Sequence, residues 1–142
     1  MTSGMCLLST LTVCGETIEV SDEEFTMRYL LSWHIRESEL RDRSPAWREE
    51  VMAFLARFED ELFTNSELDW VEVLDPETRA VVVGPGGEVR NGFYNEGGKP
   101  SARIWGIRVA SRQRAIEIAS TFAGQLDTWI EVRECLPSAQ QP

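Results

Sequence analysis

The sequence predicts an α+β fold, because two similar strand–helix patterns follow one another along the chain. In the first half, a strand over Met27–His34 precedes a helix over Ser44–Phe63. In the second half, a strand over Arg103–Val109 precedes a helix that starts at Ser111 and stops near Gly124, and a last strand over Thr128–Arg133 closes the pattern. This order is the βαββαβ outline of a ferredoxin-like domain.

The first strand and helix carry clear local patterns. Along Met27–His34, alternate residues point to opposite faces, with Tyr29 and Trp33 on one and His34 on the other. Ser44 suits the N-cap of the following helix, and Pro45 suits its first turn. The stripe expected to face the core recurs at helical spacing and comprises Trp47, Val51, Phe54 or Leu55, Phe58 and Leu62. We expect this helix to stop at Asn65, and its acidic residues, Glu49-Glu50 and Glu59-Asp60-Glu61, to form a solvated face.

The middle of the chain predicts an inserted β-hairpin. A short strand over Trp70–Leu74 is followed by a turn, and Ala80–Val83 and Glu88–Arg90 flank the glycine-rich turn Gly84–Gly87. That turn lacks the lysine and the following helix of a phosphate-binding loop. Asn91–Lys99, with three glycines, reads as a loop.

The second helix and the chain ends complete the assignment. Ser111 is the expected N-cap and Gly124 the expected stop, with Ala115, Ile116, Ala119 and Phe122 buried. We divide the chain into an N-terminal extension over residues 1–25, a domain over 26–136 and a disordered tail over 137–142. Leu7–Val13 is either an extra strand or disordered.

Composition limits the function classes. A chain of 142 residues predicts one domain, and a net charge of −10 argues against nucleic-acid binding, which depends on Lys and Arg. No apolar run approaches the roughly 18 residues of a membrane span. The three cysteines, Cys6, Cys14 and Cys135, match no zinc pattern and no paired disulfide framework. We therefore expect reduced thiols in a cytoplasmic protein.

His34 is the candidate catalytic residue. It is the single histidine of the chain, and histidine most readily supplies an acid or base near neutral pH. It ends a strand, where Asp42, Asp69 or Asp75 could orient it and Arg108 could anchor an anion. The alternative is a partly exposed histidine with no catalytic role. With one histidine and scattered cysteines we expect no metal site and no cofactor.

Three tryptophans are candidates for a ligand site. Each predicted strand in question carries one of them: Trp33, Trp105 or Trp129. If all three side chains lie on the same face of the sheet, they would line an apolar pocket or a dimer interface, with Arg108 beside them. The alternative is that they pack against the helices as core.

Several features in chain order are shared with one family. They are Trp33-His34, the Pro-led helix, Pro76-Glu77-Thr78 before Arg79–Val83, the Gly-Gly turn, Asn91-Gly92-Phe93, Ile104-Trp105-Gly106-Ile107 and Ile130-Glu131-Val132-Arg133. Over residues 26–136 the chain resembles the YCII-related family, in its DGPF-type group. The resemblance implies a ferredoxin-like fold that dimerises through its sheets into an α/β barrel. DGPF-type members often sit beside extracytoplasmic-function sigma factors, and their biochemical role is generally unassigned.

Two departures from the family pattern bear on function. Classical members carry a histidine at the start of the first helix, proposed to work with an aspartate, where this chain has Trp47. In the DGPF motif Asn91 replaces the acidic residue, and no proline precedes Phe93. We therefore expect a homodimeric module that binds a small ligand or a partner. The alternative is a lyase, isomerase or hydrolase that uses His34 as acid or base.

Overall fold

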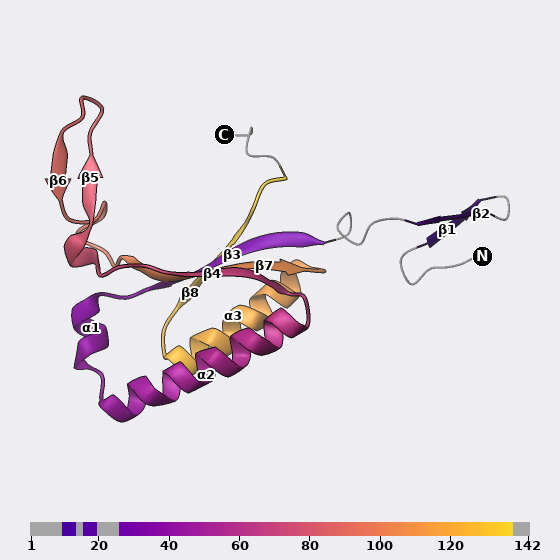
Figure 1. The fold of residues 1–142 in the computed structure, drawn as a ribbon, viewed down its shortest axis with the longest axis horizontal. Coiled ribbons are helices and arrows are strands. Elements are labelled where there is room, and N and C mark those ends of the chain that lie inside the picture. The colour runs from indigo at the N-terminus through magenta and orange to yellow at the C-terminus, as the bar shows by residue number, and fades with distance from the viewer. Residues whose placement is uncertain (1–9, 14–15, 20–25, 138–142) are drawn as a thin grey trace.

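The computed structural model describes residues 10–13, 16–19 and 26–137. In chain order its elements are β1 (Thr10–Val13), β2 (Glu16–Glu19), β3 (Met27–His34), α1 (Glu37–Asp42), α2 (Pro45–Thr64), β4 (Leu68–Val73), a 3₁₀ turn (Glu77–Arg79), β5 (Val81–Val83), β6 (Val89–Asn91), β7 (Ser101–Val109), α3 (Arg112–Leu126) and β8 (Ile130–Glu134). The central sheet is antiparallel with the order β4-β7-β3-β8, and α2 and α3 lie together on one of its faces (Figure 1). The predicted α+β class is thereby confirmed, as is the inserted hairpin, formed by β5 and β6.

The predicted alternation of β3 is confirmed. Tyr29, Leu31 and Trp33 are buried on the face that the helices cover. Leu31 sits between Trp105 of β7 and Val132 of β8, so three strands contribute to the same core face. This alternation fixes the register, because a shift by one residue would move the apolar set to the face that the helices do not cover.

Helix α2 begins and ends where its local pattern predicts. The Ser44 side chain accepts a hydrogen bond from the Trp47 backbone N–H, Pro45 is the first helical residue, and Asn65 is the C-cap. The short helix α1 was not expected, because Glu37–Asp42 has no apolar stripe and buries no residue. Its first turn is held by the Glu77 carboxylate, which accepts a hydrogen bond from the Glu37 backbone N–H.

Helix α3 differs from the prediction at two positions. Its N-cap is Ser111, as expected, but Ile118 is buried in place of Ile116, which is 38% exposed. Starting from Ala115, the buried residues follow the helical spacing of three or four and form one stripe. Ile116, one residue after Ala115, lies outside this stripe. The helix also continues past Gly124 to Leu126, because Asp127 adopts the left-handed conformation that closes it.

Glu59 corrects the prediction that the acidic residues of α2 form a solvated face. Its carboxylate receives two hydrogen bonds from Arg103, at 2.9 and 3.0 Å, and one from Trp105 Nε1 at 2.7 Å. The side chains of Arg103 and Glu59 are only 14% and 16% exposed. This carboxylate therefore joins α2 to β7 at the border of the core.

The aromatic core lies between the sheet and the two long helices. The Trp105 ring stacks on Phe122 with centroids 4.0 Å apart, and the Phe58 ring meets Phe122 edge-on at 5.0 Å. Trp105 and Phe122 are fully buried, whereas Phe58 is only partly buried. These rings pack across elements that are far apart in the sequence.

The two ends of the described chain also refine the prediction. Strand β8 begins at Ile130, so Trp129, expected on this strand, precedes it and is 93% exposed. Part of the expected Leu7–Val13 strand is present, because Thr10–Val13 pairs with Glu16–Glu19. Residues 7–9, Cys6, Cys14 and residues 138–142 of the predicted tail lie outside the described residues.

Candidate functional site

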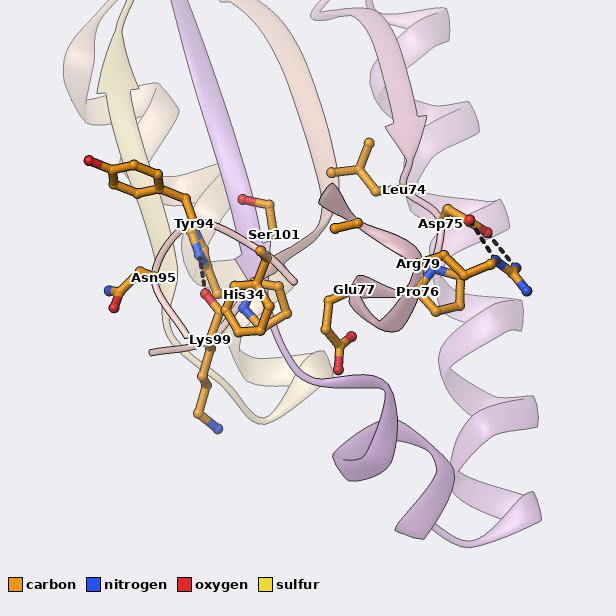
Figure 2. A pocket seen from close by; sticks show the side chains of 13 residues that line it. His34, Leu74, Asp75, Pro76, Glu77, Arg79, Tyr94, Asn95, Lys99 and Ser101 are labelled. Atoms are coloured by element: carbon orange, nitrogen blue, oxygen red, sulfur yellow. Dashed lines mark hydrogen bonds and ion pairs between the residues drawn. The ribbon is translucent and has the colours of Figure 1, made fainter. Parts of the chain in front are cut away.

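A pocket of about 420 Å³ opens at the end of β3. Its walls come from the segment between β4 and β5 and from the loop between β6 and β7, and His34 lies between them (Figure 2). The lining residues are His34, Leu74, Asp75, Pro76, Glu77, Arg79, Ala80, Phe93, Tyr94, Asn95, Lys99, Pro100 and Ser101. About half of these residues are polar or charged, but the surface that the lining presents to the pocket is mostly apolar, as in many small-molecule sites.

The first wall is held by its own carboxylates. Asp75 accepts two hydrogen bonds from Arg79, at 2.8 and 2.6 Å, and these bonds hold the pKa of the Asp75 carboxyl below its ordinary value. The Glu77 carboxylate accepts from the Glu37 backbone N–H, at 3.0 and 3.3 Å for its two oxygens. Because Glu37 begins α1, Glu77 ties this wall to the first turn of that helix.

The second wall is tied to the same helix. Arg36 Nη2 donates to the backbone oxygens of Glu96 and Gly98, both at 2.6 Å, and its guanidinium lies 5.2 Å from the centroid of the Phe93 ring. Lys99 Nζ donates to Glu39 of α1 at 2.5 Å. That bond lowers the pKa of the Glu39 carboxyl. The short helix α1 therefore positions both walls of the pocket, although it lines neither of them.

His34 sits at the floor, beside Ser101 of the neighbouring strand. The two residues are paired in the sheet just after a bulge that follows Trp33. The imidazole Nδ1 is 3.4 Å from the Lys99 backbone oxygen, and Nε2 is 3.3 Å from Glu131 Oε1. Nε2 is buried and lacks an aligned hydrogen-bond partner among the described residues. Each ring nitrogen thus already faces an oxygen atom of the protein.

The aspartates proposed to orient His34 do not do so. Asp75 lines the pocket but is occupied by Arg79, and Figure 2 shows this pair on the far wall from His34. Asp42 and Asp69 are not among the lining residues, and Asp69 forms an ion pair with Arg108 at 3.3 Å. The carboxylate nearest the ring is Glu131 of β8, which sequence reasoning missed because it lies almost one hundred residues along the chain.

The candidate ligand-binding residues Trp33, Trp105, Arg108 and Trp129 do not converge. Trp33 and Trp105 lie on adjacent strands and are buried on the helix-covered face. Arg108 is on the opposite face of the sheet, and Trp129 is exposed before β8. Among these four residues and His34, only His34 lines the pocket.

The residues that do form the pocket show only weak sequence patterns that would indicate a binding site. The turn around Pro76 and the loop Asn91–Lys99 were expected only as connections. The available signal was the aromatic pair Phe93-Tyr94 inside a glycine-rich loop, where bulky apolar side chains have no core to fill. Tyr94 is 88% exposed and lies at the rim, whereas Phe93 is half-buried.

The opposite face of the central sheet is a second surface of interest. It carries Arg28, Leu30, Ser32, His34, Trp70, Glu72, Ile104, Gly106, Arg108, Glu131 and Arg133. Within the described part of the chain no helix covers it (Figure 1). Trp70 lies over Gly106 so closely that any side chain there would collide with the indole ring. The indole nevertheless remains 44% exposed.

The described residues hold no cluster of three or more His, Cys, Asp or Glu side chains suited to a metal ion. Over the same residues, no helix is both long enough and apolar enough to cross a bilayer. Cys135 is a free thiol.

Comparison with known proteins gives no match to a family model and no match among curated proteins.

Proposed function

We propose that this protein is a small-ligand-binding module and that its ligand occupies the pocket between the β4–β5 segment and the Phe93–Pro100 loop. The observation that carries the proposal is the pocket itself, about 420 Å³ in volume and with a mainly apolar inner surface. Contacts from the start of α1, made by Arg36, Glu37 and Glu39, hold the two walls in place. Such fixed walls favour binding, because little ordering remains to be done when a ligand enters.

The proposal includes membership of the YCII-related family, DGPF type, with a ferredoxin-like fold. The strand order β4-β7-β3-β8, with two crossover helices on one face, supports that fold. The order of motifs over residues 26–136 supports the family. A cytoplasmic location is part of the proposal, because the three cysteines of the sequence match no paired disulfide framework.

A homodimer through the open sheet face is part of the same proposal. Leu30, Ile104 and Trp70 supply apolar surface at its centre, and burying it would favour association. The charges on this face are asymmetric, because its arginines gather towards the start of β3 and Glu72 and Glu131 lie nearer its end. A two-fold axis that reverses the strand direction would place the arginines of one copy over the glutamates of the other.

The dimer is tested by a charge placed on this face. In light scattering at micromolar concentration, Leu30→Glu should be a monomer, because association would strip the hydration from a charged side chain at the apolar centre of the interface. The matched control is Met52→Glu, which adds the same charge on the exposed side of α2 and should remain dimeric. A monomeric unmodified protein, or a dimeric Leu30→Glu variant, would contradict the proposed interface.

The ligand site is tested by screening a small-molecule library with NMR of the isotope-labelled protein. Binders should shift amide resonances in residues 74–80 and 93–101, which form the two walls. Hits that map only to other surfaces, or a library without a single binder, would contradict the assignment of the pocket.

A second candidate is an enzyme in which His34 acts as acid or base. The observation that favours it is Glu131, whose carboxylate lies 3.3 Å from Nε2 and would stabilise a protonated ring, although the two groups are not aligned for a hydrogen bond. Against it, Nδ1 faces the Lys99 carbonyl, and Asp75 and Arg79 occupy each other. His34→Gln separates the two functions, because it should abolish turnover by an enzyme while it largely preserves binding by a module. Arg108 is not available as the anion anchor, since it lies outside the pocket.

A further inference from the structure

We propose that the ligand of this pocket is a small, uncharged aromatic molecule with one polar substituent. The inference rests on the proposed function and specifies the chemical class that the site selects. It follows from three features of the described pocket: the pairing of its charged side chains, the fixed aromatic ring on one wall and the two polar groups at its floor.

The carboxylates and cationic side chains of the lining already have partners within the protein. Arg79 is bound by both oxygens of Asp75, and Lys99 is bound by Glu39. The Glu77 carboxylate holds the backbone N–H at the start of α1. An anion would lose its hydration without gaining a free cationic partner, and a cation would gain only the Glu77 carboxylate, which already binds the Glu37 backbone N–H. The lining therefore disfavours both anions and cations.

An aromatic ligand fits because Phe93 presents a ring that is already fixed. The Arg36 guanidinium packs 5.2 Å from the ring centroid and also binds the backbone of the same loop at two points. The opposite wall offers the apolar side chains of Leu74 and Pro76. A planar ring between these walls gains contact area and an aromatic pair without ordering a loop.

The polar substituent is expected at the floor, beside Ser101 and His34. These residues are paired where the central strand β3 ends and its neighbour β7 begins, and both line the pocket. The Ser101 hydroxyl can both donate and accept a hydrogen bond. An amide or hydroxyl on the ligand satisfies such a group without bringing a charge into the site.

The experiment compares three probes of nearly equal shape at neutral pH: 1-naphthamide, 1-naphthoate and 1-naphthylmethylammonium. Their dissociation constants for the full-length protein are measured by equilibrium dialysis. We expect the neutral amide to bind at least about tenfold more tightly than either ion, because a tenfold ratio corresponds to only a small part of the cost of desolvating a charge. If the anion or the cation binds more tightly than the amide, the proposed ligand class is wrong, whereas the proposed binding function is not affected. Binding of none of the three, by a protein shown to be folded, overturns both.

Two matched variants locate the bound probe. Phe93→Ala removes the ring on the pocket wall and should weaken binding of the amide about fivefold, which is the ratio that corresponds to the loss of about 1 kcal/mol from one aromatic pair. Phe63→Ala removes an equal ring from the exposed surface of α2, where Phe63 is 66% exposed, and should leave the affinity unchanged. Equal affinities of the two variants would show that the amide binds elsewhere and would overturn the assignment.

Discussion

Replacing Glu59 with alanine tests how the helix α2 is joined to the sheet. The change leaves Trp105 Nε1 without its acceptor and Arg103, which is 14% exposed, without its counter-charge. An unsatisfied buried donor costs about 1–3 kcal/mol, and breaking a fully buried ion pair costs about 3–5 kcal/mol. Because this pair keeps some solvent contact, we expect a loss of about 2–4 kcal/mol in the free energy of unfolding. For a chain of this size that corresponds to a fall of about 6–15 °C in the melting temperature.

The assay is thermal and urea unfolding of Glu59→Ala, Glu59→Gln and Asp60→Ala. Glu59→Gln keeps an acceptor for Trp105 but loses the charge, so its loss of unfolding free energy should lie between the losses of Glu59→Ala and Asp60→Ala. Asp60 is the adjacent exposed acid, and its replacement should change stability by less than about 0.5 kcal/mol. Adding Arg103→Met completes a double-mutant cycle that isolates the ion pair from the rest of the effect. If Glu59→Ala were no more harmful than Asp60→Ala, the cluster would have no role in stability.

Three further predictions concern other parts of the fold. Phe122→Ala should cost about 3–5 kcal/mol in urea unfolding, because the ring is fully buried against Trp105, whereas the exposed Phe63 should tolerate the same change. The pKa of Glu39 is lowered in the folded state, so its pairing with Lys99 stabilises the fold above the ordinary carboxyl pKa of 4.5 and this contribution is lost as the pH falls through the lower folded value. A Lys99→Met variant should therefore show a shallower acid dependence of its melting temperature, and an unaltered slope would rule out this contribution. Removing residues 1–25 should leave a cooperative melt, since the four-stranded sheet contains neither β1 nor β2, and a broad or absent transition would show that the segment is required.

Several local features of the fold could be predicted from the sequence because their causes are local. Ser44 and Ser111 cap helices through bonds to backbone groups three residues away. The alternation along Met27–His34 needs no knowledge of the partner strands, since it follows from the geometry of a single strand. The α+β class and the inserted hairpin rest on signals of this kind. Even so, Gly124 did not end its helix, because Asp127 supplied the left-handed residue three positions later.

The candidate site was decided by contacts between distant parts of the chain. His34 was identified from its chemistry alone, but its neighbours Lys99 and Glu131 are placed by the pairing of β3 with β7 and β8. Trp129 and Trp105 looked alike as strand residues, yet one is exposed and the other stacks on Phe122.

Thus the sequence by itself determined where the long helices begin, which face of β3 is apolar and that a hairpin interrupts the domain. Only the tertiary structure decided which carboxylates are buried, which tryptophans enter the core and where a pocket opens. The physical reason is the distance along the chain over which each interaction acts. Capping and alternation act within a few residues, whereas the walls of the pocket meet because α1 holds two loops through Glu77, Arg36 and Lys99. No local pattern in the sequence records those three contacts.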